Sequence, residues 1–329
     1  MSLSDVQEPR PRSQACCAPS RAPVASQSPS RTVAQPRRAA GTRLSGLVNV
    51  PGGRFLMGTD DGEGFPADGE GPVREVVVGR FRLAAAAVTV SQFATFVKAT
   101  GYLTEAERFG WSYVFEALVG SDVTVRGVAD GTPWWIAVDG ASWRHPEGPG
   151  SSISTRQHHP VVHVSWNDAI AFCRWRGARL PTEAEGERAA RGGLVQKQFP
   201  WGDELTPRGV HQCNIWQGVF PHHNTGEDGH LGTAPVKAYR PNGFGLYNMS
   251  GNVWEWCSDW FSPDFHLEGP RTDPQGPAVG IARVLRGGSY LCHASYCNRY
   301  RLAARSSNSP ESTTGNIGFR IAAASDSEH

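Results

Sequence analysis

Apolar residues at helical spacing predict the first of three helices in this chain. Phe93, Phe96 and Val97 stand three and four positions apart, which places them on one face of a helix. A serine precedes this run as a candidate N-cap, and Gly101 follows it as a stop signal. The pattern therefore predicts a helix over Ser91–Thr100.

Start and stop residues mark the two other helices. The first covers Asn167–Arg176, begins on an asparagine cap and ends before a glycine. The second covers Thr182–Arg191, where Thr182-x-x-Glu185 is a capping box and two glycines follow. Short strands are predicted at Arg74–Val78, Val161–Val164 and Arg283–Leu285.

The rest of the chain from Leu47 onward lacks long periodic segments and evident repeats. The whole sequence contains 38 glycines, 24 prolines and 11 tryptophans, which favour structured loops with tryptophan side chains in the core. We therefore predict a single α+β domain with little regular secondary structure, covering residues 46–324. Residues 325–329 are assigned to a short C-terminal tail.

The first 45 residues differ sharply in composition. They contain no aromatic residue, and seven arginines against Asp5 and Glu8 give them a net charge of +5. Because such a segment buries too little apolar surface to offset its ordering entropy, we predict a disordered basic tail over residues 1–45, rich in proline, serine, alanine and arginine. It also lacks the apolar stretch of a signal peptide.

Charge and hydropathy give no sign of a polyanionic partner or a membrane span. The net charge of the whole chain is +1, and no run approaches the ~18 apolar residues that a span requires. We expect a cytoplasmic protein, a monomer, that binds neither nucleic acid nor membrane. Cys173, Cys213 and Cys257 each stand among apolar or aromatic neighbours and are expected to be small buried hydrophobes.

Two of the seven cysteines, Cys292 and Cys297, stand five residues apart in a run rich in tyrosine, arginine and turn residues. On a strand, an odd separation places two side chains on opposite faces. On a helix, five residues correspond to roughly 500°, so the side chains diverge by about 140°. The two thiols can therefore meet only across a turn, as a disulfide or as a soft-metal site.

The cysteine segment also resembles a known family. Ser289-Tyr-Leu-Cys-His-x-Ser-Tyr-Cys-Asn-Arg-Tyr-Arg301 and Gly315-Asn-Ile-Gly-Phe-Arg320 resemble the active-site region of the formylglycine-generating enzymes. Further similar blocks occur in family order, namely Val50–Gly58, His159–Asp168, Arg179–Glu185, Asn214–Gly218, Asn224–Gly229 and Asn242–Trp256. The resemblance runs from about Leu47 to Ala323 and implies the family's α+β fold, which is distantly similar to C-type lectins.

The resemblance implies a copper- and O2-dependent oxidase. Such enzymes convert the cysteine of a Cys-x-Pro-x-Arg motif in an unfolded sulfatase, or in a peptide, into Cα-formylglycine. Cys292 and Cys297 would hold Cu(I), with the substrate cysteine as a third sulfur ligand. Ser289 and Tyr296 match positions that form hydrogen bonds in the pocket for oxygen and the substrate thiol. Trp254 matches a tryptophan that lines this pocket, and Asn316 a polar residue at its edge.

The resemblance also implies two structural Ca²⁺ ions, which take oxygen ligands. Asn214 and Asp228, with the carbonyls of Ile215 and His230, match one site. Asn248 and Glu255, with the carbonyls of Gly251 and Val253, match the other. From the residues alone, caps and turns explain these positions equally well.

Three alternatives to a catalytic copper site are open. A structural disulfide or two inert thiols would also explain the cysteine pair. An iron-dependent sulfoxide synthase shares the catalytic-domain fold, but Ser165 stands where its His-x₃-His-x-Glu motif requires glutamate, and we do not expect His159 and His163 to chelate a metal. A non-catalytic binding paralogue is the third, and such paralogues lack the cysteine pair.

The chain departs from the family pattern at a few positions. Gly186 and Arg188 replace two aromatic residues, and this glycine falls inside a predicted helix. Leu302 and Ile321 stand where some relatives carry additional cysteines, so Cys173 has no such partner.

Overall fold

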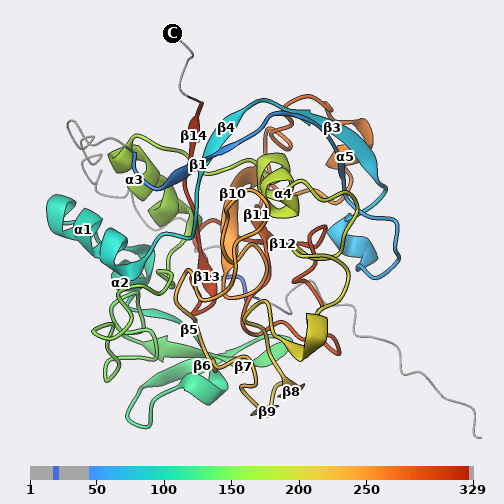
Figure 1. Ribbon diagram of the computed structural model, residues 1–329. Helices are drawn as coiled ribbons and strands as arrows, with labels where there is room; N and C mark the ends of the chain where they lie inside the picture. Colours follow the sequence, from blue (N-terminus) through green and yellow to red (C-terminus); the bar gives the residue numbers. More distant parts are fainter. Residues whose placement is uncertain (1–17, 22–43, 326–329) are drawn as a thin grey trace, which may run out of the picture.

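A four-stranded sheet occupies the centre of the molecule in Figure 1, which shows the computed structural model. The structure describes residues 18–21 and 44–325. In spatial order the central strands are β12 (Arg305–Asn308), β11 (Arg283–Arg286), β10 (Trp254–Trp260) and β13 (Ile317–Gly318). β11 is antiparallel to β10 and β12, whereas β13 is parallel to β10. The long segment between β11 and β12 contains both cysteines of interest.

Four smaller sheets surround this centre. In Figure 1 the sheet β1–β4–β14 lies above it and the sheet β5–β7–β6 below it. The paired strands are β1 (Leu47–Val50), β4 (Phe81–Ala84) and β14 (Ala322–Ala324); β2 (Gly53–Met57) and β3 (Arg74–Val78); β5 (Trp111–Phe115), β7 (Thr132–Asp139) and β6 (Val125–Ala129); β8 (Gly218–Val219) and β9 (His223–Asn224). The predicted α+β class with little regular structure is confirmed.

All three predicted helices are present, with corrected starts for two of them. α1 spans Val90–Thr100 and is capped by Thr89, not by a serine, because a reciprocal capping box joins Thr89 and Gln92. α3 spans Trp166–Arg176 and is capped by Ser165, whose hydroxyl accepts the Asp168 N–H. In both cases the helix starts after the residue that forms a capping box with the side chain three positions later.

The third predicted helix is confirmed with its capping box. α4 spans Glu183–Arg191, and the Thr182 side chain accepts the Glu185 N–H. Two short helices escaped the sequence analysis, α2 (Glu105–Phe109) and α5 (Phe265–Glu268). Three short 3-10 turns cover Pro66–Asp68, Glu116–Leu118 and Pro207–Gly209.

Two of the three predicted strands are confirmed, Arg74–Val78 as β3 and Arg283–Leu285 as most of β11. The prediction of a strand at Val161–Val164 is wrong. His163 has φ +57°, so the backbone reverses there and forms no ladder. All four residues are buried. Their apolar character therefore reflects burial in the core rather than strand pairing.

The main core is aromatic. Phe93 contacts Phe96, Phe172 and Trp143 with ring centroids 5.3 to 5.9 Å apart, and Phe172 contacts Phe319 at 5.4 Å. These edge-on and stacked pairs bind α1, α3 and the C-terminal region together, each contributing ~1 kcal/mol beyond its buried area.

The isolated cysteines behave as predicted. Cys173, Cys213 and Cys257 are buried, and burial raises the pKa of each thiol. Ile321 belongs to the same apolar cluster as Cys173, and Leu302 is buried as well. Hydrophobic packing thus occupies the positions where some relatives carry cysteine.

The predicted disordered tail is wrong for four of its residues. Residues 1–17 and 22–43 lie outside the described residues, but Ala18, Pro19 and Arg21 are buried on the body of the protein. Composition missed this contact because an arginine docks through charge and aromatic faces, not through apolar area. Within the two described ranges, no helix is long and apolar enough to cross a bilayer.

Candidate functional site

The loop between β11 and β12 brings the two cysteines onto successive turns. The carbonyl of His293 accepts the N–H groups of Tyr296 (3.0 Å), Cys297 (2.9 Å) and Asn298 (3.1 Å). The backbone therefore folds over itself between the two cysteines, as their spacing requires. Both side chains are buried, Cys292 with 0% and Cys297 with 1% exposure.

Cys292 faces a small pocket with mostly aromatic walls. The pocket is lined by Trp134, Trp135, Phe220, Ser289, Leu291, Cys292 and Tyr296. Tyr296 stacks on Phe220 with centroids 4.5 Å apart and meets Trp134 edge-on at 5.0 Å. Three of the predicted site residues, Ser289, Cys292 and Tyr296, thus lie at one pocket.

A chain of hydrogen bonds connects Asn316 to this pocket. Its Nδ2 donates to Ser289 Oγ at 3.0 Å, and its Oδ1 accepts from Thr314 Oγ1 at 2.6 Å. The N–H of Ser289 points to the Cys292 sulfur at 3.4 Å. The Asn316 amide therefore holds the hydroxyl of Ser289, and the Cys292 sulfur accepts its backbone N–H.

Trp254 lies next to Asn316 but does not line the pocket. The backbone N–H of Trp254 donates to the carbonyl of Asn316 at 2.9 Å. The indole is fully buried in the same apolar cluster as Cys292 and Cys297. Its Nε1 has no hydrogen-bond partner among the described residues.

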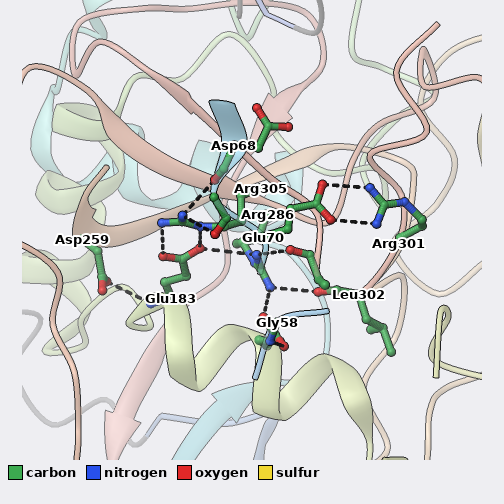
Figure 2. A network of polar contacts seen from close by, with 12 residues as sticks. Gly58, Asp68, Glu70, Glu183, Asp259, Arg286, Arg301, Leu302 and Arg305 are labelled. Atoms are coloured by element: carbon green, nitrogen blue, oxygen red, sulfur yellow. Dashed lines mark hydrogen bonds and ion pairs between the residues drawn. The ribbon is translucent and has the colours of Figure 1, made fainter. Parts of the chain in front are cut away.

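Buried ion pairs fix both ends of the cysteine loop (Figure 2). Before the loop, Arg286 contacts Glu183 at 3.3 Å and Glu187 at 2.5 Å on α4. After it, Arg301 forms two parallel hydrogen bonds with Glu70, at 2.7 and 2.8 Å, and Arg305 pairs with Glu183 at 2.5 Å. Such two-point arginine–carboxylate pairs fix orientation as well as distance.

The electrostatics agree with this geometry. Burial alone would raise the pKa of Glu187, but the charges of Arg191 and Arg286 outweigh it and lower the pKa to about 2. The pKa of Glu183 is also lowered, by Arg305 and Arg286 against the effect of burial. Both carboxylates therefore stay ionised where they hold the arginines.

The first predicted calcium site offers oxygen atoms in a suitable setting. Asn214 Oδ1 is buried and has no hydrogen-bond partner in the described part of the chain. Asp228 lies beside it, since its two oxygens accept the N–H groups of Ile215 at 3.0 Å and His230 at 2.9 Å. An orphaned amide oxygen beside a carboxylate fits a hard cation. Gln217 Nε2, however, already donates to the Ile215 carbonyl and to Asp228 Oδ2.

The second predicted calcium site is only partly of this kind. Asn248 Oδ1 is likewise buried and without a partner among the described residues. Asn248 and Gly251 have φ values of +48° and +74°, so the loop up to Val253 turns sharply. Glu255, however, gives both carboxylate oxygens to Arg320, which already neutralises its charge.

The two histidines of the His-x₃-His sequence hold separate partners. His163 is fully buried between Ser112 Oγ and the carbonyl of Pro146, each at 2.8 Å, and burial lowers its pKa to about 4. His159 contacts Thr233 Oγ1 at 2.9 Å. Across the described ranges, no group of three or more His, Cys, Asp or Glu side chains is placed to hold a metal.

Sequence reasoning missed the aromatic walls and the ion-pair partners. Trp134, Trp135 and Phe220 lie far from the cysteines in the chain. The adjacent Trp134 and Trp135, which lie on β7, were the signal in the sequence that could have pointed to the pocket. The carboxylates that anchor the loop come from α4 and from residues 68–70, and no short-range pattern connects them to it.

Comparison with known proteins identifies the family. The model of the sulfatase-modifying factor enzyme 1-like domain matches residues 32–325. The formylglycine-generating enzyme of Streptomyces coelicolor is 63% identical over 91% of this chain and 96% of its own length. The mouse enzyme of the same name is 53% identical over 91% of this chain and 82% of its own length.

Two further comparisons add one curated protein and one solved structure. A bovine protein named inactive C-alpha-formylglycine-generating enzyme 2 is 46% identical over 84% of this chain and 87% of its own length. The solved structure of PvdO from Pseudomonas aeruginosa has a TM-score of 0.62 and 24% identity, covering 84% of this chain and 94% of PvdO, and shows the shared fold. The family match and these identities establish that the chain belongs to the family of sulfatase-modifying factor enzyme 1-like domains.

Proposed function

We propose that this chain oxidises the cysteine of a Cys-x-Pro-x-Arg segment in an unfolded sulfatase to Cα-formylglycine. The observation that best supports this proposal is the pocket in which Ser289, Cys292 and Tyr296 meet. These residues lie on a loop that buried ion pairs fix at both ends. Relatives that match nearly the whole chain bear the name of this activity. The small, largely aromatic pocket suits a small oxidant and one thiol.

Cys292 and Cys297 are the proposed ligands of Cu(I). Thiolates are soft donors that favour this ion over hard cations, and both sulfurs are shielded from water. The thiol of the substrate cysteine would be the third sulfur ligand. When bound, copper would supply the one-electron chemistry with dioxygen.

The chain's own residues would orient the reactants and exclude water. Ser289, held by Asn316, offers its hydroxyl to a small molecule in the pocket. The stacked rings of Tyr296 and Phe220 close the apolar wall. The backbone N–H of Trp254 binds the carbonyl of Asn316 and so helps to position Asn316. Trp254 is therefore a positioning residue rather than part of the pocket lining.

The overall reaction balances with a thiol as second reductant. The substrate loses a Cβ hydrogen and the thiol proton, and water then replaces the sulfur, which leaves as hydrogen sulfide. Dioxygen is reduced to water by electrons from the substrate cysteine and from a second thiol compound, which becomes a disulfide. A compartment that keeps thiols reduced supplies such a compound. We therefore propose a cytoplasmic location, which the three buried cysteine thiols elsewhere in the core support.

We also propose a structural Ca²⁺ at Asn214 and Asp228 and a second near Asn248. The orphaned amide oxygens of Asn214 and Asn248 support both. A cation at either position would satisfy a buried polar atom that otherwise costs ~1–3 kcal/mol. The pairing of Glu255 with Arg320 makes the second site the weaker ligand set.

Mass spectrometry of a Cys-x-Pro-x-Arg peptide, incubated with the enzyme, Cu(I), a thiol and air, tests the function. Conversion removes about 18 mass units from the peptide. Cys292→Ser and Cys297→Ser should each abolish it and lower bound copper below one ion per chain. Cys173→Ala, at a buried thiol outside the pocket, is the matched control and should retain conversion.

The same assay separates catalysis from a binding-only role. A binding-only role is a real alternative because one close relative is named inactive. Peptide binding without any mass change under saturating copper would establish that role. Full turnover by either serine variant would exclude the two-thiolate site.

A further inference from the structure

Arg21 occupies a built site on the surface of the protein body. Its guanidinium lies 3.8 Å from the ring centroid of Trp111 and 4.1 Å from that of Phe109. Its Nη2 donates to the carbonyl of Trp111 at 3.1 Å and to Thr313 Oγ1 at 3.4 Å. The residue is only 6% exposed. Two aromatic faces and two oxygen acceptors together recognise an arginine specifically.

The residues before Arg21 are held along their backbone. Asn308 Nδ2 donates to the carbonyls of Ala18 at 3.3 Å and Pro19 at 3.2 Å, while its Oδ1 accepts from Ser20 Oγ at 2.6 Å. The N–H of Arg21 donates to a buried serine hydroxyl at 2.8 Å. A chain segment bound through its main chain and one anchored side chain is the usual mode of peptide recognition.

The docked segment completes a motif. With the residue that precedes it, it reads Cys17-Ala18-Pro19-Ser20-Arg21, which fits the Cys-x-Pro-x-Arg pattern of the proposed substrate. Pro19 and Arg21, the two fixed positions that the structure describes, are buried, and the variable Ser20 between them is exposed. Both fixed positions that the structure describes are therefore buried, as is Ala18 at the other variable position.

The arginine site and the cysteine pocket both use residues of the segment between β12 and β13. Thr313, which contacts Arg21, is followed three residues later by Asn316, the partner of Ser289. Ala18, at the other end of the segment, belongs to the apolar cluster that contains Cys292 and Cys297.

We propose that residues 17–21 are an intramolecular substrate, and that the protein oxidises Cys17 of its own chain to Cα-formylglycine. This inference rests on the proposed function. The reaction has the same balance, with dioxygen as oxidant and a thiol as second reductant. The site around Trp111 and Thr313 would then bind the arginine of external substrates, for which the tethered segment competes.

Mass mapping of the purified full-length chain tests the proposal. After incubation with Cu(I), a thiol and air, Cys17 should lose about 18 mass units and react with a hydroxylamine probe for aldehydes. The adjacent Cys16 has no proline two residues further on and should remain a thiol. A chain with an unchanged Cys17 that still converts an external Cys-x-Pro-x-Arg peptide overturns the proposal but leaves the proposed function intact. If neither Cys17 nor the cysteine of the external peptide is converted, the proposed function itself fails.

Two variants examine the docking contacts. Arg21→Ala removes a buried charged group with two acceptors and should lower conversion of Cys17 about tenfold or more. Arg54→Ala, which removes an exposed arginine that pairs with Glu75 and not with the docked segment, is the matched control, and its conversion of Cys17 should stay close to that of the unmodified chain. Because the empty groove no longer contains a tethered competitor, Arg21→Ala should also lower the KM for the external peptide severalfold. An unchanged KM would show that the segment lies outside the substrate groove.

Isotope labelling distinguishes reaction within one chain from reaction between chains. Unlabelled protein is mixed with ¹⁵N-labelled Cys292→Ser, which keeps its own Cys17. Conversion confined to the unlabelled chains supports an intramolecular reaction. Equal conversion in both would show that residues 17–21 react only as an ordinary external substrate.

Discussion

Replacing Glu187 by glutamine should destabilise the fold by several kcal/mol. The side chain is 1% exposed and accepts four hydrogen bonds. Its Oε1 accepts from Gly58 N at 2.8 Å and from two nitrogens of Arg191, at 2.7 and 3.0 Å. Its Oε2 accepts from Arg286 at 2.5 Å. The variant leaves two buried guanidinium groups with too little negative charge.

Two independent arguments give a similar magnitude for the loss of folding stability in Glu187→Gln. Breaking a buried ion pair by removing one charge costs about 3–5 kcal/mol. The pKa of Glu187 is lowered from 4.5 to about 2, which corresponds to about 3 kcal/mol of stabilisation at neutral pH. Glu75→Gln is the matched control, because the Arg54–Glu75 pair is exposed, with 74% and 51% of the two side chains accessible. Its loss should cost at most about 1 kcal/mol.

Urea unfolding followed by tryptophan fluorescence measures both variants. A lowered carboxyl pKa stabilises the fold fully above the ordinary pKa, and this contribution is lost as pH falls towards 2. The unmodified protein should therefore lose stability between about pH 5 and 2, and Glu187→Gln should lose less over that interval. Equal losses for the buried and exposed variants at neutral pH would refute the reasoning.

Three further outcomes are expected. Gly186→Ala should raise the free energy of unfolding by about 1 kcal/mol, because the new Cβ would meet only Cys257 Sγ, at 3.9 Å. Gly186→Trp should raise the melting temperature further by filling the adjoining pocket, with turnover unchanged. A lower melting temperature would show that this pocket cannot hold an indole. Chelation of calcium should lower the melting temperature, and Asp228→Ala should weaken this response; a melting curve indifferent to chelator would exclude the ion. Burial and the charge of Glu183 raise the pKa of Asp259 to about 7. The contribution of Asp259 to stability therefore falls as pH rises from about 4 through 7. Asp259→Asn should gain stability relative to the unmodified chain between pH 5 and pH 8, which thermal melts at these two pH values would measure.

Features that depend on nearby residues could be predicted from the sequence. The capping box Thr182-x-x-Glu185 fixed the start of α4 because both partners lie within one turn. The need for a turn between Cys292 and Cys297 followed from their spacing alone. The predicted start of α1 was wrong because Thr89, not the serine, forms the reciprocal capping box with Gln92.

Features that depend on distant residues could not be predicted in this way. Four arginines flank or follow the cysteines, but their carboxylate partners stand about 100 to 230 positions away in the chain. The aromatic wall of the pocket likewise comes from β7 and from the β8–β9 turn. A family resemblance could place the thiols and the polar residues beside them. It could not show that buried ion pairs hold the loop in place.

The N-terminal segment shows why composition is a poor guide to binding. Composition decides whether a segment can bury enough apolar surface to fold alone, and residues 1–45 cannot. Binding to a groove that the rest of the protein has already formed has a much smaller requirement. Four residues suffice here, because Asn308 holds the backbone and two aromatic rings receive the guanidinium of Arg21. A short sequence with the right chemistry at fixed positions can therefore dock within a tail whose average composition predicts disorder.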